Sequence, residues 1–267
     1  MAREPTARHL LIGTAMLYVG IVLLAPLAGM VAELGHTGLA EPLRALLEPG
    51  ALAALRMSLV LTVLSVAINS VVGVVLAIAI VRHRFLLRTV VNALADLPLA
   101  VSPVMVGLAF FLVFGRDGWF GSTLERFDLK VVFAFSGLLL GTSFVALPYT
   151  LREVAYVLQE LGTSEEEAAA TLGASPWQIF VRVTLPNIRF ALGYGVVMTT
   201  ARSLGEFGAV LVLGGSISGQ TQTATTFIHD AIEERAMGSA YGMALLLAAA
   251  SVCLLLGLEW AKRRKVQ

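Results

Sequence analysis

Four uncharged, mostly apolar stretches limit what this chain can fold into, because each is long enough to cross a lipid bilayer. They cover residues 10–32, 57–81, 131–151 and 237–258. About 20 apolar residues suffice for a spanning helix, which satisfies its own backbone hydrogen bonds where lipid offers none. Only 14% of the residues are charged, against about 25% in soluble domains. We therefore predict an all-α, polytopic membrane protein.

Two further stretches bring the prediction to six transmembrane helices in a single domain covering residues 1–267. Residues 89–115 are interrupted by one acid and two prolines, and residues 188–214 contain Arg202 and Glu206 in their interior. Arg3 and Arg8 ahead of the first span also fit a secretory signal peptide. That apolar run is longer than a usual signal core and more spans follow, so we favour an uncleaved first span.

The basic residues indicate which side of the membrane each loop occupies, because cytoplasmic loops carry an excess of Lys and Arg. We place both termini and residues 164–186 inside. Twelve basic residues then lie inside and six outside, and Arg202 falls within a span. The bias agrees with an even number of spans and cytoplasmic termini.

A polar segment, SEEEAAATLGASPWQIFVRVTLP at residues 164–186, separates the fourth and fifth spans. Ser164 is typical of the start of a helix with a capping box. Gly173 can end that helix in a left-handed turn, and Ser175-Pro176 can begin another. Pro186 should limit how far the second helix runs unbroken. The segment predicts a compact helix–turn–helix, whose small alanine side chains would let another chain come close.

The spacing of this segment resembles the EAA loop of bacterial ABC importer permeases. Glu-Ala-Ala is followed after three residues by Gly, and after nine more by Val-Thr-Leu-Pro, where the family usually has Ile in place of Val. The resemblance implies a cytoplasmic loop that sits in a groove of an ATPase subunit; an ordinary interhelical loop is the competing interpretation. The residues it assigns to ATPase coupling are Glu167, Ala168, Ala169, Gly173, Val183, Leu185 and Pro186.

Four further stretches are similar to the permeases of sulfate/thiosulfate ABC importers, most of all to their W-type subunit. They are ADLPLAVSPVMVGL at 95–108, GRDGWFG at 115–121, TLPNIRFALGYGVV at 184–197 and ARSLGEFGAV at 201–210. The resemblance implies a type I ABC importer permease fold and import of sulfate or thiosulfate into the cytoplasm. The GEFG sequence at 205–208 is shared with molybdate and tungstate permeases, so those oxyanions are the alternative cargo.

The same resemblance implies the partners of this chain. They are a dimer of ATP-binding subunits, a second homologous permease that completes a heterodimer, an extracytoplasmic sulfate-binding protein, and the lipid of a bacterial cytoplasmic (inner) membrane. The permease is expected to be no enzyme and to bind no cofactor, since ATP and Mg²⁺ belong to the ATPase subunits. The sequence has no GxxxxGK[ST] phosphate-binding pattern. Its net charge of +1 gives no reason to expect nucleic acid, and its four scattered histidines form no metal-ligand spacing.

The third predicted span contains a candidate part of the translocation pathway or gate. Pro98 and Pro103 each remove a helical hydrogen bond, and broken helices at membrane depth are tolerated where they are buried or line a cavity. Asp96 lies on the cytoplasmic side of this break. Two roles stay open for Asp96: a functional acid, or a residue that serves a structural partner. Its charge would repel an anionic cargo, so it is a poor direct ligand.

The fifth predicted span carries the other pathway candidates, Arg202 and Glu206. They are four residues apart, so they can pair on one face of a helix, which lowers the cost of burying both. One interpretation is an internal ion pair that fixes helix packing. The other is that Arg202 faces the passage and offers its charge to a passing anion.

Two other classes of protein fit the sequence less well. An ion-coupled secondary transporter predicts inverted repeats and paired acids at mid-membrane, and we find neither pattern in the sequence. A membrane-embedded enzyme predicts a nucleophile with a base, or a metal triad, within the spans, and the sequence shows neither.

Overall fold

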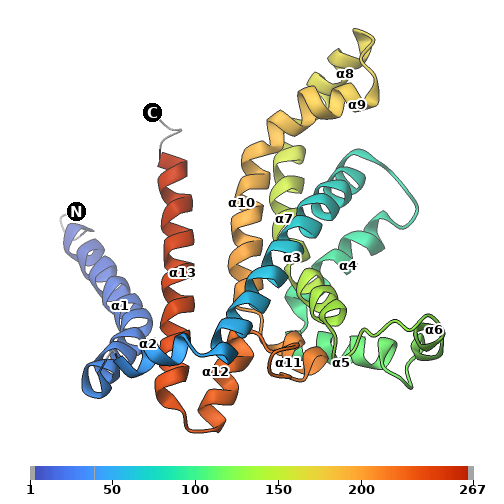
Figure 1. The fold of residues 1–267 in the computed structure, drawn as a ribbon. Helices are drawn as coiled ribbons and strands as arrows, with labels where there is room; N and C mark the ends of the chain where they lie inside the picture. The colour runs from blue at the N-terminus through green and yellow to red at the C-terminus, as the bar shows by residue number, and fades with distance from the viewer. Residues whose placement is uncertain (1–3, 39, 264–267) are drawn as a thin grey trace.

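The computed structural model describes residues 4–38 and 40–263, and every regular element among them is helical (Figure 1). This confirms the all-α prediction. The elements are α1 Glu4–Thr37, α2 Ala40–Leu46, α3 Pro49–Arg82, α4 Arg88–Ala100, α5 Pro103–Phe114, α6 Gly121–Arg126, α7 Phe135–Leu161, α8 Ser164–Thr171, α9 Pro176–Ile179, the π-helical η1 Phe180–Thr184, α10 Leu185–Leu204, α11 Gly208–Gly214, α12 Ala224–Glu233 and α13 Met237–Arg263.

The centre of the molecule is formed by α3, α7 and α10, which pack against one another. Their interfaces combine small residues with side-chain hydrogen bonds, the two means by which helices associate in lipid. Asn69 Nδ2 on α3 donates to the Ser143 carbonyl on α7 at 3.0 Å. Thr150 on α7 and Thr199 on α10 join their hydroxyls at 2.8 Å. A Cβ atom at Gly195 would lie 2.8 Å from the Thr150 Cα, so α10 needs glycine there to reach α7.

Helices long and apolar enough to span a membrane match most of the predicted spans. They cover Arg8–Ala32, Pro49–Arg82 and Met237–Gly257, and two bent helix pairs raise the number to as many as five. The fourth predicted span, 131–151, overlaps α7, which does not pass this test of length and composition. Polar side chains of α7, including Thr142 and Thr150, are fully buried against its neighbours. The number six stays a prediction.

Both spans in which the sequence places charges are broken helices. The third consists of α4 and α5, bent by 118°, and the fifth ends in α10 and α11, bent by 55°. Pro103 is the first residue of α5, whereas Pro98 lies within α4 and is buried. The helices that follow the two breaks, α5 and α11, pack closely against each other. A Cβ atom at Gly208 would lie 2.9 Å from the Val104 backbone nitrogen.

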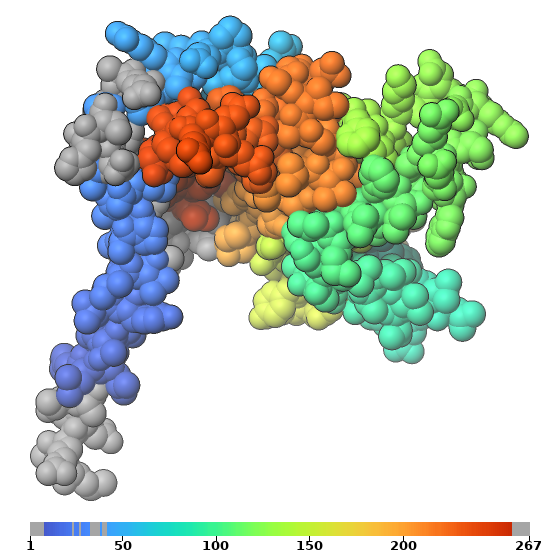
Figure 2. Space-filling view, turned by 90° about the horizontal axis from the view of Figure 1, so that it is seen from below, coloured from blue at the N-terminus to red at the C-terminus, as the bar shows by residue number. Residues whose placement is uncertain are grey.

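The helices divide the molecule into two ends. At one end α8 and α9 project beyond the bundle, and α1 starts and α13 finishes toward this side (Figure 1). At the other end the chain forms α2, α6, α11 and α12 (Figure 1). Figure 2, which faces this second end, shows the orange α11–α12 region between the light-blue α2–α3 segment and the green α5–α6 segment. The segment before α12 is packed rather than solvated, since Thr221, Gln222 and Thr223 are buried.

Two glycines of α10 offer a test of the central packing. We expect Gly195→Ala to lower the free energy of unfolding by about 1–3 kcal/mol, because the added methyl group meets the α7 backbone. The matched control is Gly193→Ala, since a Cβ atom at Gly193 would meet nothing within 4 Å. Thermal unfolding of both variants in detergent measures the difference, and equal unfolding temperatures would contradict the packing described here.

Candidate functional site

The segment between α7 and α10 folds as two short helices joined by a left-handed glycine. Helix α8 begins one residue earlier than the sequence indicated, because Thr163 and not Ser164 is its N-cap. The Thr163 hydroxyl donates to Glu167 Oε1 at 2.6 Å, and the Glu167 N–H donates to the Thr163 carbonyl at 2.9 Å. Gly173 has φ +84°, as predicted. The helix–turn–helix interpretation of this segment is therefore confirmed.

Ser175 caps the second short helix, as predicted, and Gln178 completes a capping box there. The Ser175 N–H donates to Gln178 Oε1 at 2.8 Å, and the Gln178 N–H donates to Ser175 Oγ at 3.4 Å. Pro176 occupies the first helical position, where its missing N–H leaves no helical bond unmade.

The expected interruption at Pro186 is absent, and α9 continues through η1 into α10. Proline has no N–H to donate to the carbonyl four residues back. The chain adapts by widening to a π-helix over Phe180–Thr184, where the Leu185 N–H donates to the Phe180 carbonyl five residues back. Such π-helical turns are frequent at functional sites. The second helix of the loop and α10 therefore form one continuous rod, Pro176–Leu204.

The predicted coupling residues divide between the surface and the bundle. Glu167, Ala168 and Gly173 are exposed, whereas Ala169 and Val183 are half-buried. Leu185 is half-buried and packs against the cluster of buried residues that α3, α7 and α10 form, and Pro186 is exposed at the start of α10. Two large apolar side chains that the motif does not include, Leu172 and Trp177, are 87% and 71% exposed. The loop thus presents two large apolar side chains that the described residues leave largely uncovered.

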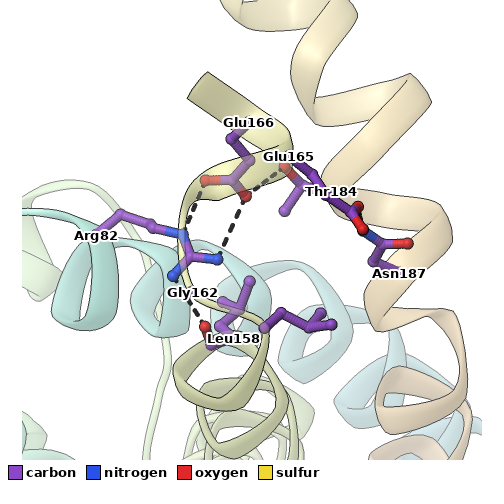
Figure 3. A pocket seen from close by; sticks show the side chains of 8 residues that line it. Arg82, Leu158, Gly162, Glu165, Glu166, Thr184 and Asn187 are labelled. Carbon is purple, nitrogen blue, oxygen red and sulfur yellow. Dashed lines mark hydrogen bonds and ion pairs between the residues drawn. The ribbon is translucent and has the colours of Figure 1, made fainter. Parts of the chain in front are cut away.

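Below that surface lies a polar cluster that sequence reasoning missed, which we call the Arg82 junction (Figure 3). Arg82, the last residue of α3, donates through Nε to Glu166 Oε2 at 2.9 Å and through Nη2 to Glu166 Oε1 at 3.4 Å. Its Nη1 donates to the Leu158 carbonyl of α7 at 2.9 Å, and the Thr184 hydroxyl of η1 donates to Glu166 Oε1 at 2.8 Å. The junction, Arg82, Leu158, Glu166 and Thr184, therefore joins α3, α7, α8 and η1.

A second carboxylate of α8 contacts α10 beside the junction. Glu165 Oε2 accepts a hydrogen bond from Asn187 Nδ2 at 2.5 Å. Glu165 thus contacts α10, and Glu166 contacts both Arg82 of α3 and Thr184 of η1. Glu167 bonds Thr163, the N-cap of α8 itself. The contact of Glu166 with Arg82 spans 84 residues of the chain, a separation that local sequence patterns do not bridge.

Asp96, the acid among the candidates in the third span, forms an ion pair with α7. Arg152 Nε on α7 lies 2.6 Å from Asp96 Oδ1 on α4. The same guanidinium donates to the Asn92 side-chain oxygen at 2.8 Å and to the Asn92 carbonyl at 3.0 Å. Of the two roles open for Asp96, the geometry favours the partner in an ion pair, which fastens α4 to α7 next to Pro98.

The candidates in the fifth span pair across the end of a helix. Arg202 Nη1 lies 2.8 Å from Glu206 Oε2, and their side chains are 24% and 1% exposed. Because α10 ends at Leu204, Arg202 lies in its last turn and Glu206 in the break that follows, so the pair does not lie on one helix face as expected. Glu206 Oε1 also accepts the Ala209 N–H at 2.9 Å, which caps α11. The Glu206 carbonyl accepts the Thr225 hydroxyl at 2.6 Å, which ties the break to α12.

Comparison with known sequences gives a family match and several similar proteins. Residues 69–267 match the family model "Binding-protein-dependent transport system inner membrane component". The chain is 44% identical, over 91% of its length and 85% of the other protein, to "Sulfate transport system permease protein CysW" of Synechococcus elongatus. It is 41% identical to the protein of that name from Escherichia coli, over 94% of this chain and 87% of that one. It is 36% identical to "Sulfate transport system permease protein CysT" of Escherichia coli, over 95% and 91%.

Comparison with solved structures gives the fold. A chain of a bacterial alginate ABC transporter, crystallised with an alginate pentasaccharide-bound periplasmic protein, superposes with a TM-score of 0.81 at 18% identity, over 99% of this chain and 96% of that one. The fold predicted from the sequence, that of ABC importer permeases, is therefore confirmed. Together with the match over residues 69–267, these findings show that the chain belongs to the family of binding-protein-dependent transport system inner membrane components.

Proposed function

We propose that this chain is the permease subunit of an ATP-driven importer that moves sulfate and thiosulfate into the cytoplasm. One structural observation carries the transport role: the exposed α8–α9 loop is continuous with α10, which leads to a charged break inside the bundle. The relatives named as sulfate permeases, identical at 41–44% over more than nine-tenths of the chain, support sulfate as the cargo. Molybdate or tungstate, the alternative cargo, is not favoured by these relatives.

The partners follow from this role. A dimer of ATP-binding subunits docks on the apolar surface of α8 and α9, where Leu172 and Trp177 stand out. A second permease of the CysT kind completes a heterodimer, and an extracytoplasmic sulfate-binding protein delivers the cargo. The end with α8, α9 and both termini faces the cytoplasm of a bacterial cell. The chain itself performs no catalysis and binds no cofactor, because ATP and Mg²⁺ are held by the ATPase subunits.

The geometry then describes how the motion is used. Closure of the ATPase dimer moves α8 and α9, and the continuous rod from Pro176 to Leu204 carries the movement to the break before α11. Arg202 lies at that break with its side chain partly exposed, where its charge attracts an oxyanion. Glu206 holds Arg202 in place and is kept from the cargo by its own burial. The Asp96–Arg152 pair keeps α4 against α7 during this movement.

Transport by the purified complex tests the proposed function. We expect the tagged chain to copurify with an ATPase and a second permease, and the reconstituted complex to take up labelled sulfate only with ATP and the binding protein. Uptake that an uncoupler abolishes but ATP depletion leaves intact would contradict it in favour of a secondary transporter. Molybdate uptake that sulfate does not inhibit would contradict the choice of cargo alone.

Substitutions at the break test the role of Arg202. We expect Arg202→Ala to lower uptake about tenfold, the effect of losing one charged hydrogen bond of about 1.4 kcal/mol, and Arg202→Lys to retain part of it. Because Arg202→Ala leaves Glu206 buried without its ion pair, the double variant Arg202→Ala/Glu206→Gln separates assembly from transport. It should assemble normally and still transport poorly. The control Arg189→Ala changes an exposed arginine on the same helix. Full uptake by the double variant would rule out the pathway role.

A further inference from the structure

We propose that Arg82 is a positioning residue for energy coupling, which joins α3 to the docking loop through Glu166 so that a movement of α8 reaches α3 as well as α10. The inference rests on the proposed function, since it assumes that an ATPase docks on this loop. None of the predicted coupling residues belongs to α3, so the assignment adds a second route into the bundle.

Helix α8 depends on polar contacts for its orientation because packing does not supply it. The helix has eight residues, Ser164–Thr171, and none of them is buried. Glycines with positive φ lie on both sides of it, Gly162 at +64° and Gly173 at +84°, and a Cβ atom at either would meet nothing within 4 Å. The chain therefore bends sharply at both ends of α8 in open space. What connects α8 to the bundle is the pair of acids, Glu165 toward α10 and Glu166 toward α3.

The Arg82 guanidinium is suited to hold such an element rigidly. Nε and Nη2 of this planar group donate to the Glu166 carboxylate, and Nη1 donates to the Leu158 carbonyl (Figure 3). The two acceptors together fix the orientation of the guanidinium. The Arg82 and Glu166 side chains are only 11% and 21% exposed, which makes the pair stronger than one at the surface. Thr184 adds a hydrogen bond from η1 to the same carboxylate.

Helix α3 can carry the movement through the whole molecule. It is a continuous helix of 34 residues from Pro49 to Arg82. Along its length Asn69 bonds the α7 backbone at 3.0 Å. Near its other end Ser58 Oγ accepts the N–H of Ala224, the first residue of α12, at 2.8 Å. A displacement of α3 at Arg82 can therefore reach α12 through Ser58. Helix α12 is in turn tied to the break, because the Thr225 hydroxyl donates to the Glu206 carbonyl.

The ratio of cargo taken up to ATP hydrolysed by the reconstituted complex tests the proposal. We expect Arg82→Gln and Glu166→Gln each to lower this ratio about tenfold, equivalent to about 1.4 kcal/mol, while ATP hydrolysis continues. The exchange Arg82→Glu/Glu166→Arg should recover part of the ratio. Glu165→Gln is the matched control, because an amide oxygen there can still accept from Asn187. A purely stabilising role would lower the unfolding temperature or the yield and leave the ratio unchanged, and that result would overturn the proposal.

A second measurement needs no cargo and so separates this proposal from the proposed function. Spin labels at Ala170→Cys on α8 and Val75→Cys on α3, in a Cys253→Ser background, report the distance between the two helices in the full complex. We expect one narrow distribution with and without ATP, and a broadened, nucleotide-dependent one after Arg82→Gln. An unchanged distribution in Arg82→Gln would refute the positioning role. If the wild-type complex takes up another oxyanion, the ratio is measured with that ion; if it takes up none, only the proposed function fails.

Discussion

The absence of water in the bilayer is the constraint on which the rest of this structure depends. A polar group within the bundle is stabilised by a partner on the protein, because lipid offers none. The central helices use short side chains for such contacts: Asn69 bonds the α7 backbone, and Thr150 bonds Thr199. These bonds need close helices, and Gly195 allows the approach. Close packing and hydrogen bonding are thus a single requirement here.

The same constraint explains where the two helix breaks are and how they are held. A break exposes the last carbonyls of one helix and the first N–H groups of the next. At the second break Glu206 accepts the Ala209 N–H and pairs with Arg202, so the groups freed by the break are used. The positive charge of Arg202 is therefore held next to the interrupted backbone. In the proposed transport role, that charge serves an anionic cargo without a separate binding residue.

Outside the bundle, hydrogen bonds and an ion pair hold α8 in position, whereas buried packing holds the helices within the bundle. Helix α8 buries none of its residues, and two of its acids fix its position: Glu165 bonds Asn187, and Glu166 bonds Arg82 and Thr184. This leaves the apolar side chains Leu172 and Trp177 free on the outer surface. An element held from below by polar contacts and exposed above as an apolar patch is suited to receive force from another subunit and pass it on.

The sequence by itself determined the helical class, the cap of the second loop helix at Ser175 and the turn at Gly173, because these depend on neighbouring residues along the chain. It also indicated the pairing of Arg202 with Glu206, since only four residues separate them. Only the tertiary structure decided that Pro186 is accommodated by a π-helix, that Asp96 pairs with Arg152, and that Glu166 binds Arg82. Each of these depends on how distant helices approach one another. Local spacing carries no record of contacts made across 56 or 84 residues, which the packing of the bundle alone determines.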